Sequence, residues 1–315
     1  MSRLIVLAIG GNSLIRDEQH RTVPDQWVLA RETCHHIAQI VERGHRVVIT
    51  HGNGPQVGFI IRRSELARHE LHPVPLDSCD ADTQGAIGYM IQQSLENEFL
   101  RRGMRKSAVA LVTQVQVDAN SPAFSQPTKP IGALMDEVTA RARAAQEGWV
   151  VREDARRGWR RVVPSPEPVA IVEIDAIRTL VDAGFVVTAV GGGGIPVVRD
   201  ADGTLRGVEA VIDKDLSSAL LATALGAEQF VISTSVCRVC LDFATPQQRP
   251  VDRLPAEEAR QHLADGQFGE GSMAPKIRAV LRYLDQGGRE AVITCPQELE
   301  AAVERRAGTR ITAQR

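Results

Sequence analysis

Three short glycine-rich segments each follow an apolar run, and their bare backbone suits the binding of an anion. They are Gly10-Gly11-Asn12 after residues 4–9, His51-Gly52-Asn53-Gly54-Pro55 after 47–50, and Gly191-Gly192-Gly193-Gly194 after 185–190. Without a Cβ, backbone N–H groups can converge on a phosphate or a small oxyacid, and a following helix N-terminus adds partial positive charge. One such turn usually only reverses the chain. Three of them favour a site for a polyanion or a phosphoryl group.

The chain has few lysines, and three of them stand beside Pro, Asp or Gly motifs. Lys129 lies between two prolines, Lys214 directly precedes a helical pattern, and Lys276 follows Pro275, which can open a helix. A lone lysine is usually a solvated charge, but a cation at a helix start is disfavoured by the helix dipole, which favours a functional role. Phosphoryl transfer needs such charges around the moving group. Asp215 could cap its helix, or it could orient lysines or a metal.

Other motifs are absent or ambiguous. The sequence has neither G-x-x-x-x-G-K-[ST] nor G-x-G-x-x-G, so a P-loop and that type of dinucleotide site are not supported. His51 could be an acid or base, or a strand-end histidine bonded to backbone. Five scattered cysteines argue against a disulfide framework. The Cys237 and Cys240 pair has C-x-x-C spacing but lacks a second ligand pair, so we expect buried free thiols.

The composition is that of a globular protein of one large α/β unit or two lobes. The 315 residues are 43% hydrophobic and 24% charged, with a net charge of −2, which gives no broad attraction to nucleic acid or to an anionic membrane. No apolar run is long enough to span a membrane, and the N-terminus lacks a signal-peptide plan, so a cytoplasmic protein is expected. An arginine group interrupted by Glu153 and Asp154 is expected to be a solvated face; its members are Arg152, Arg156, Arg157, Arg160 and Arg161.

Strand and helix patterns alternate along the chain, which predicts a mostly parallel sheet with helices on both faces. The expected strands are 4–9, 46–50, 107–112, 185–190, 228–232 and 290–294. The expected helices are 24–43, 80–102, 175–183, 215–225 and 275–285. Residues 117–168 break the alternation and predict a small insertion on the main sheet. Residues 197–207, centred on Asp202-Gly203, predict a hairpin.

Several longer segments occur in an order that is particular to one family. Besides the three glycine turns they include Pro127-Thr128-Lys129-Pro130-Ile131-Gly132, residues 158–166, Gly207-Val208-Glu209-Ala210-Val211-Ile212-Asp213-Lys214-Asp215, and Gly271-Ser272-Met273 with Pro275-Lys276. On these segments, which span nearly the whole chain, the sequence resembles the carbamate kinases of the amino acid kinase superfamily.

The resemblance implies a three-layer αβα sandwich with two lobes and a small protruding subdomain. Residues 1–210 would bind carbamate or carbamoyl phosphate, with 117–168 as the protruding subdomain, and 211–315 would bind the nucleotide. The implied reaction is reversible transfer between carbamoyl phosphate and ADP, giving ATP and carbamate, with Mg²⁺, in a homodimer without nucleic-acid or membrane partners.

The resemblance also implies roles for individual residues. Lys129 would reach in from the protruding subdomain, Lys214 and Lys276 would neutralise the phosphates, and Asp215 would organise the two lysines. The residues implied to bind the small substrate are Gly10, Gly11, Asn12, Gly52, Asn53 and Gly54. Those implied to bind the nucleotide are Gly191, Gly192, Thr234, Ser235, Cys240 and Met273.

Two departures from the family pattern keep alternatives open. Ser235 and Cys240 stand where the family usually has Asp and Tyr, and cysteine cannot offer adenine the flat face of a tyrosine. Asp80 and Asp82 add carboxylates beside the expected acid site. The alternatives are a kinase with another small acid or altered nucleotide use, and a catalytically weak paralogue that binds ligand in a regulatory role.

Overall fold

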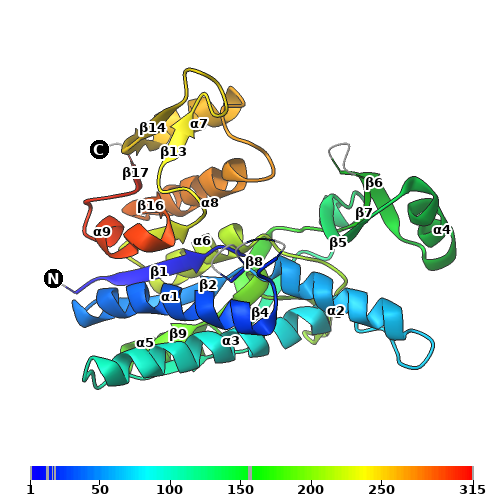
Figure 1. Cartoon of the computed structure of the whole chain (residues 1–315), viewed down its shortest axis with the longest axis horizontal. Helices are drawn as coiled ribbons and strands as arrows, with labels where there is room; N and C mark the ends of the chain where they lie inside the picture. Colours follow the sequence, from blue (N-terminus) through cyan, green and yellow to red (C-terminus); the bar gives the residue numbers. More distant parts are fainter. Residues whose placement is uncertain (1, 12–13, 16, 18, 155–157, 314–315) are drawn as a thin grey trace.

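An eight-stranded sheet forms the centre of the protein (Figure 1). The computed structural model describes residues 2–11, 14, 15, 17, 19–154 and 158–313. The strand order is β15-β17-β16-β12-β1-β2-β9-β3, and the pairs are parallel except for β16 with β17. The strands are β1 (Leu4–Ile9), β2 (Arg46–His51), β3 (Ala108–Ala110), β9 (Val186–Thr188), β12 (Gln229–Ser233), β15 (Arg253–Pro255), β16 (Glu290–Thr294) and β17 (Thr309–Thr312). The predicted α/β fold with a mostly parallel sheet is confirmed.

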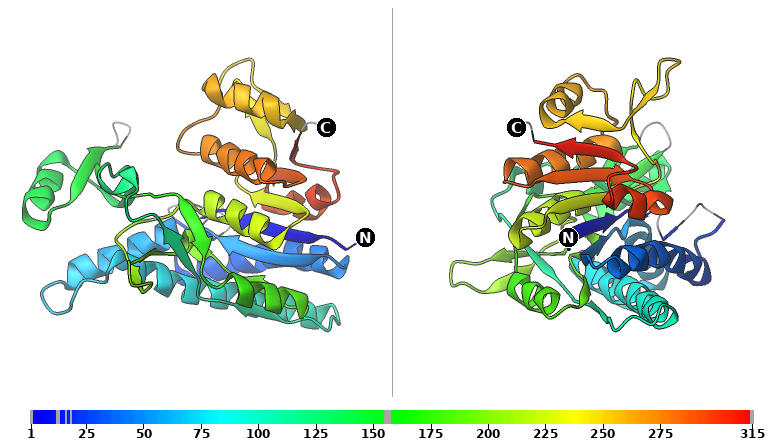
Figure 2. Two further views of the ribbon diagram at one scale, coloured as in Figure 1. Left: turned by 180° about the vertical axis from the view of Figure 1, so that it is seen from behind. Right: turned by 90° about the vertical axis from the view of Figure 1, so that its left-hand side faces the viewer.

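Helices cover both faces of this sheet because its central strands are apolar on both sides (Figure 2). Along β1, Val6 and Ala8 belong to one buried cluster and Ile5 and Leu7 to the other. The first cluster draws on α5 (Ile174–Asp182), α6 (Lys214–Leu225), α7 (Ala256–Ala264) and α8 (Met273–Asp285). The second draws on α1 (Val23–Glu42), α3 (Leu76–Arg101) and α9 (Leu299–Val303). The result is a three-layer sandwich.

The predicted insertion is an arm that projects from the main body (Figure 1). Its antiparallel sheet has the order β5-β7-β6, from β5 (Lys129–Met135), β7 (Trp159–Val163) and β6 (Val150–Glu153). The helix α4 (Glu137–Glu147) packs on it. Within the arm, Arg160 pairs with Asp154 at 3.1 Å, and Arg161 stacks on the ring of Trp149. Arg156 and Arg157 lie outside the described residues.

A second sheet connects the arm to the body. Its order is β11-β10-β4-β8, from β4 (Gln114–Val117), β8 (Pro168–Ile171), β10 (Ile195–Arg199) and β11 (Leu205–Gly207). The antiparallel pairing of β10 with β11 confirms the predicted hairpin. No helix in the described part of the chain is long and apolar enough to span a bilayer.

Several elements were not expected from the sequence. The helix α2 (Gly54–Ala67) follows the second glycine turn directly, and α4 begins at Glu137 with Asp136 as its N-cap. The helix α3 begins at Leu76 rather than at Asp80, so Asp80 lies one turn inside it. The hairpin of β13 (Val239–Leu241) and β14 (Arg249–Val251) was also missed.

The expectation of buried free thiols at Cys237 and Cys240 was wrong for Cys237. Cys237 and Cys295 form a disulfide, with Cα atoms 4.4 Å apart. Both residues follow neighbouring parallel strands, β12 and β16, which end at one edge of the sheet and bring distant cysteines together. Cys34 and Cys79 are buried free thiols, and Cys240 is a half-buried one, so the C-x-x-C cysteines do not pair with each other.

Candidate active site

The glycine turns meet at the carboxyl edge of the sheet, because β1, β2 and β9 are parallel neighbours. A Cβ added to Gly52 would lie 3.2 Å from the backbone N of Gly11 and 3.7 Å from Cδ of Lys214. A Cβ on Gly193 would collide with the backbone carbonyl of Ile212. Glycine is therefore required where these backbones approach one another. Asn12, predicted beside Gly11, lies outside the described residues.

Two predicted lysines share one buried carboxylate. Lys214 Nζ lies 2.5 Å from Asp215 Oδ1, and Lys276 Nζ lies 3.0 Å from Asp215 Oδ2. The Asp215 side chain is 5% exposed, against 13% for Lys214 and 16% for Lys276. Burial alone would raise the pKa of Asp215, but Lys214 and then Lys276 outweigh it and hold the pKa below its usual value. The carboxylate therefore stays charged and fixes both ammonium groups.

Asp213, rather than Asp215, caps the helix α6. Its Oδ1 accepts from the backbone N of Asp215 at 2.9 Å and of Leu216 at 3.4 Å. Its Oδ2 accepts from Lys129 Nζ at 3.0 Å. Lys129 begins β5 of the arm, so this ion pair joins the arm to the start of α6. The cap role that the sequence left open for Asp215 belongs to its neighbour, and Asp215 is free to hold lysines.

The second glycine turn opens α2 without a side-chain cap. Asn53 occupies the N-cap position, but its side chain makes no bond to the helix backbone. Among the described hydrogen bonds none uses the N–H groups of Gly54 or Gln56. Uncapped N–H groups at a 14-residue helix favour an oxyanion. These free N–H groups lie next to Gly52, whose own N–H donates to the Ile9 carbonyl at 3.0 Å. Gly52 in turn lies beside Gly11 and Lys214.

Gly191 and Gly192 lie against His51 and Asn53 of the second glycine turn. A Cβ on Gly191 would collide with His51, and one on Gly192 would collide with Asn53. Gln84 donates to the carbonyl of Gly191 at 2.9 Å and braces the loop. Burial lowers the pKa of His51 to about 4, so its imidazole is neutral, and its Nδ1 lies 3.2 Å from the Gly52 carbonyl. These contacts favour the structural interpretation of His51 over an acid or base role.

A cavity of about 480 Å³ extends from Lys276 into the C-terminal half. It is lined by the predicted residues Gly10, Gly11, Thr234, Ser235, Cys240, Met273 and Lys276. Gly191 and Gly192, predicted for the nucleotide, are not among its lining residues. The sequence interpretation missed Phe243, which also lines the cavity and whose ring is exposed. An aromatic residue three positions after Cys240 was the available signal.

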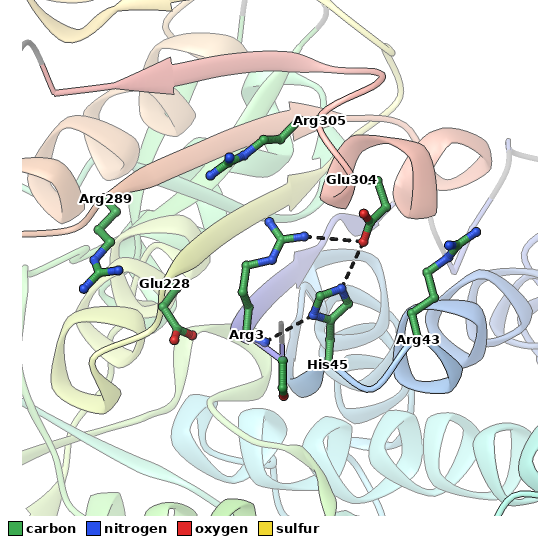
Figure 3. A pocket seen from close by; sticks show the side chains of 8 residues that line it. Arg3, Arg43, His45, Glu228, Arg289, Glu304 and Arg305 are labelled. Atoms are coloured by element: carbon green, nitrogen blue, oxygen red, sulfur yellow. Dashed lines mark hydrogen bonds and ion pairs between the residues drawn. The ribbon is translucent and has the colours of Figure 1, made fainter.

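A larger cavity, of about 820 Å³, lies at the opposite edge of the sheet (Figure 3). Its lining includes residues that directly precede strands: Arg3, His45, Glu228 and Arg289. Arg3 donates to the carbonyl of Val303 at 2.9 Å, and His45 Nε2 lies 3.0 Å from Glu304 Oε1. Cations stabilise helix C-termini, so Arg3 holds the end of α9. The candidate active site is the other edge, where the strands end.

Comparison with known proteins shows the family of the chain. Residues 3–295 match the family model described as the amino acid kinase family. The chain belongs to the amino acid kinase family. It is 48% identical over 314 residues to the carbamate kinase-like protein YahI of Escherichia coli, covering 99% of both chains. It is 44% identical over 313 residues to the carbamate kinase of Pyrococcus furiosus, again over 99% of both.

A solved structure of the same family has the same fold. The carbamate kinase of Giardia lamblia bound to AMP-PNP superposes with a TM-score of 0.93, at 38% identity over 99% of both chains. Together these relatives identify the protein as a phosphotransferase of the carbamate kinase type.

Proposed function

We propose that the protein transfers a phosphoryl group reversibly between carbamoyl phosphate and ADP. An oxygen of the ADP β-phosphate attacks the phosphorus, the bond from phosphorus to the carbamoyl oxygen breaks, and carbamate leaves with the electron pair as ATP forms. The observation that carries the proposal is Asp215, buried between Lys214 and Lys276 at the edge where the glycine turns meet.

The lysines would supply most of the catalysis. The charge that spreads over the transferring group is stabilised by positive groups held in place before the reaction, in a site poor in water. Asp215 fixes Lys214 and Lys276 from one side, so neither ammonium has to reorganise. Lys129 would approach from the arm, and its present partner Asp213 would compete with the ligand for it.

The small acid would lie among the backbone amides. Gly11 and Gly54 follow two parallel strands that end side by side, and the uncapped start of α2 lies at the same place. The N–H of Gly52, between them, is already bonded to the Ile9 carbonyl, so Gly52 would contribute the close approach of its backbone. The residues proposed to bind it are Gly10, Gly11, Asn12, Gly52, Asn53 and Gly54. Residues 1–210 would thus bind carbamate or carbamoyl phosphate, with 117–168 as the arm.

The nucleotide would be bound mainly by residues 211–315, in the cavity of about 480 Å³ that Gly10 and Gly11 also line. Ser235 and Cys240 line it, in positions where the resemblance led us to expect Asp and Tyr. The exposed ring of Phe243 offers a flat apolar face on the same cavity, and its neighbours Asp242 and Ala244 both have positive φ, 51° and 62°. We propose that Phe243 stacks on the base in place of the missing tyrosine.

A protein cage for Mg²⁺ is not formed by the described residues. The carboxylates near the lysines, Asp213 and Asp215, already pair with ammonium groups. The metal-ligand cluster found in the described ranges contains Cys237 and Cys295, whose sulfurs are joined in the disulfide. Mg²⁺ usually keeps several waters and binds through phosphates and one or two carboxylates. We propose that it enters on the nucleotide.

The test is a coupled assay for ATP from carbamoyl phosphate and ADP, run beside acetyl phosphate and beside other nucleoside diphosphates. The proposal expects turnover with carbamoyl phosphate and ADP. Faster turnover with another acyl phosphate or diphosphate would favour the alternative that Ser235 and Cys240 suggest, a kinase with altered substrate or nucleotide use. Ligand binding without turnover would favour a regulatory paralogue.

We also propose the homodimer that the resemblance implies and the cytoplasmic location that the sequence pattern predicts. Disulfides are uncommon in the reducing cytoplasm, so the Cys237–Cys295 bond is evidence against a cytoplasmic location. Sedimentation would test the dimer, and thiol titration of freshly purified protein would test whether the disulfide is present.

A further inference from the structure

The side-chain amide of Asn53 is held in one orientation by α3. Its Nδ2 donates to Asp80 Oδ1 at 2.8 Å and to Thr83 Oγ1 at 2.8 Å. The Thr83 hydroxyl gives its own hydrogen to the backbone carbonyl of Asp80 at 2.8 Å, so its oxygen can only accept from Asn53. Both N–H groups of the amide are therefore used, and a flipped amide would place Oδ1 against two acceptors.

This orientation leaves Asn53 Oδ1 as an unused acceptor at the acid site. In the described part of the chain no hydrogen bond uses this oxygen. It also does not belong to the fully buried side-chain atoms that lack a hydrogen-bond partner. In an N-cap asparagine this oxygen normally accepts a hydrogen bond from a backbone N–H of its own helix, but Asn53 makes no such bond. A Cβ on Gly192 would lie 2.9 Å from Oδ1, so the glycine leaves space there.

We infer that Asp80 is a positioning residue that turns Asn53 Oδ1 toward the ligand, so that the acid site selects an acyl phosphate bearing an N–H over one that lacks it. This inference rests on the proposed function and names its substrate class. Carbamoyl phosphate carries an NH₂ group where acetyl phosphate carries a methyl group of similar size. The NH₂ can donate to Oδ1, whereas the methyl group would leave the oxygen unpaired.

The burial of Asp80 supports a positioning role. The residue is 1% exposed, and its described hydrogen-bond partner is the neutral amide of Asn53 rather than a cation. Burial raises the pKa of its carboxyl to about 7, against the opposing effect of the Asn53 bond. Burying a carboxyl group costs free energy unless a hydrogen bond compensates for it, so its burial here favours a specific partner. It points to Asn53, which explains how an acidic residue stands close to an anion site.

The test measures binding of carbamoyl phosphate and of acetyl phosphate by calorimetry, in the cold and without nucleotide. The wild type should prefer carbamoyl phosphate by about tenfold, the value of one good hydrogen bond. Asp80→Ala should bring the ratio of the two dissociation constants close to one, and Asp80→Asn, whose Oδ1 can still accept, should restore it. Asp82→Ala is the matched control, because this carboxylate is exposed on the same helix.

Further variants distinguish the inference from its alternatives. In an Asn53→Ala background Asp80→Ala should have no further effect on the ratio, because Asp80 acts through Asn53. If Asp80→Ala does not fold, Thr83→Val removes the other acceptor and should lower the ratio by itself. A wild type without the preference, including one that binds neither compound, overturns the inference, as does a ratio unchanged in Asp80→Ala. ATP formation with an unchanged ratio rejects this inference alone, whereas a changed ratio without ATP formation rejects only the proposed reaction.

Discussion

Replacing Lys276 by alanine should abolish most phosphoryl transfer while leaving the protein folded. Lys276 Nζ lies 3.0 Å from Asp215 Oδ2, and its side chain is 16% exposed, so its charge is held in a partly dry site. Removing one preorganised group aimed at transition-state charge costs about 3–4 kcal/mol, or roughly 10²–10³ in kcat. The loss in kcat is therefore expected to fall in that range.

The fold should tolerate the change because Asp215 keeps a partner. Lys214 Nζ remains 2.5 Å from Asp215 Oδ1, so the buried carboxylate is not left unpaired. We expect the free energy of unfolding to fall by about 1 kcal/mol, which is roughly 2–4 °C in Tm. The wild type and Lys276→Ala would be compared by the coupled ATP assay and by thermal unfolding.

Lys214→Ala and Lys106→Ala complete the series. Lys214→Ala should behave like Lys276→Ala, since it leaves Asp215 with Lys276. Lys106 is the matched control, because it is exposed and donates to the backbone carbonyl of Gly184. Near-normal kcat in both Lys214→Ala and Lys276→Ala would refute the proposal that these lysines stabilise the transferring phosphoryl group. A large loss in Lys106→Ala would show that the assay reports something other than the site.

Three further outcomes are expected. Lys129→Ala should lower kcat by at least about tenfold with an unchanged Tm, since an oriented charge is lost from a partly exposed ion pair; unchanged turnover would remove the arm from the mechanism. Phe243→Ala should weaken ADP binding by about 1–3 kcal/mol in calorimetry, by analogy with base stacking on aromatic residues; an unchanged affinity would show that the base lies elsewhere. Burial raises the native pKa of Asp80 to about 7 from 3.8, so the native state binds that proton more tightly than the unfolded chain does. The contribution of Asp80 to stability therefore falls as pH rises from about 4 to about 7. In urea unfolding, Asp80→Asn should gain stability relative to the wild type across this pH range. If the free energies of unfolding of the two proteins change in parallel with pH, the shift is contradicted.

The layered fold could be predicted from the sequence because its signals are local. Apolar runs such as 4–9 and 290–294 are buried on both faces, and glycines such as Gly226 end helices in the left-handed conformation. The helix α2 was missed because its N-cap, Asn53, lies inside a glycine-rich turn and does not cap the helix with its side chain. The start of α3 was placed too late because Pro75 marks it without a polar cap.

The site could be predicted in its residue types, but only part of its pairings was expected. The sharing of Asp215 by Lys214 and Lys276 was implied by the family resemblance and not by local pattern, because Lys276 and Asp215 are 61 positions apart. The disulfide between Cys237 and Cys295 spans 58 positions and depends on which strands are neighbours. Periodicity carries no such information. The role of Asp80 likewise appears only when α3 packs against the turn that holds Asn53.

The transfer of a phosphoryl group from carbamoyl phosphate to ADP can be followed by ³¹P NMR of the reacting mixture. We expect the carbamoyl phosphate resonance to fall as a γ-phosphate resonance of ATP rises in equal amount. We also expect Lys276→Ala to slow both changes by roughly 10²–10³. Loss of carbamoyl phosphate to inorganic phosphate at the rate seen without protein, with no γ-phosphate resonance, would contradict the proposed reaction.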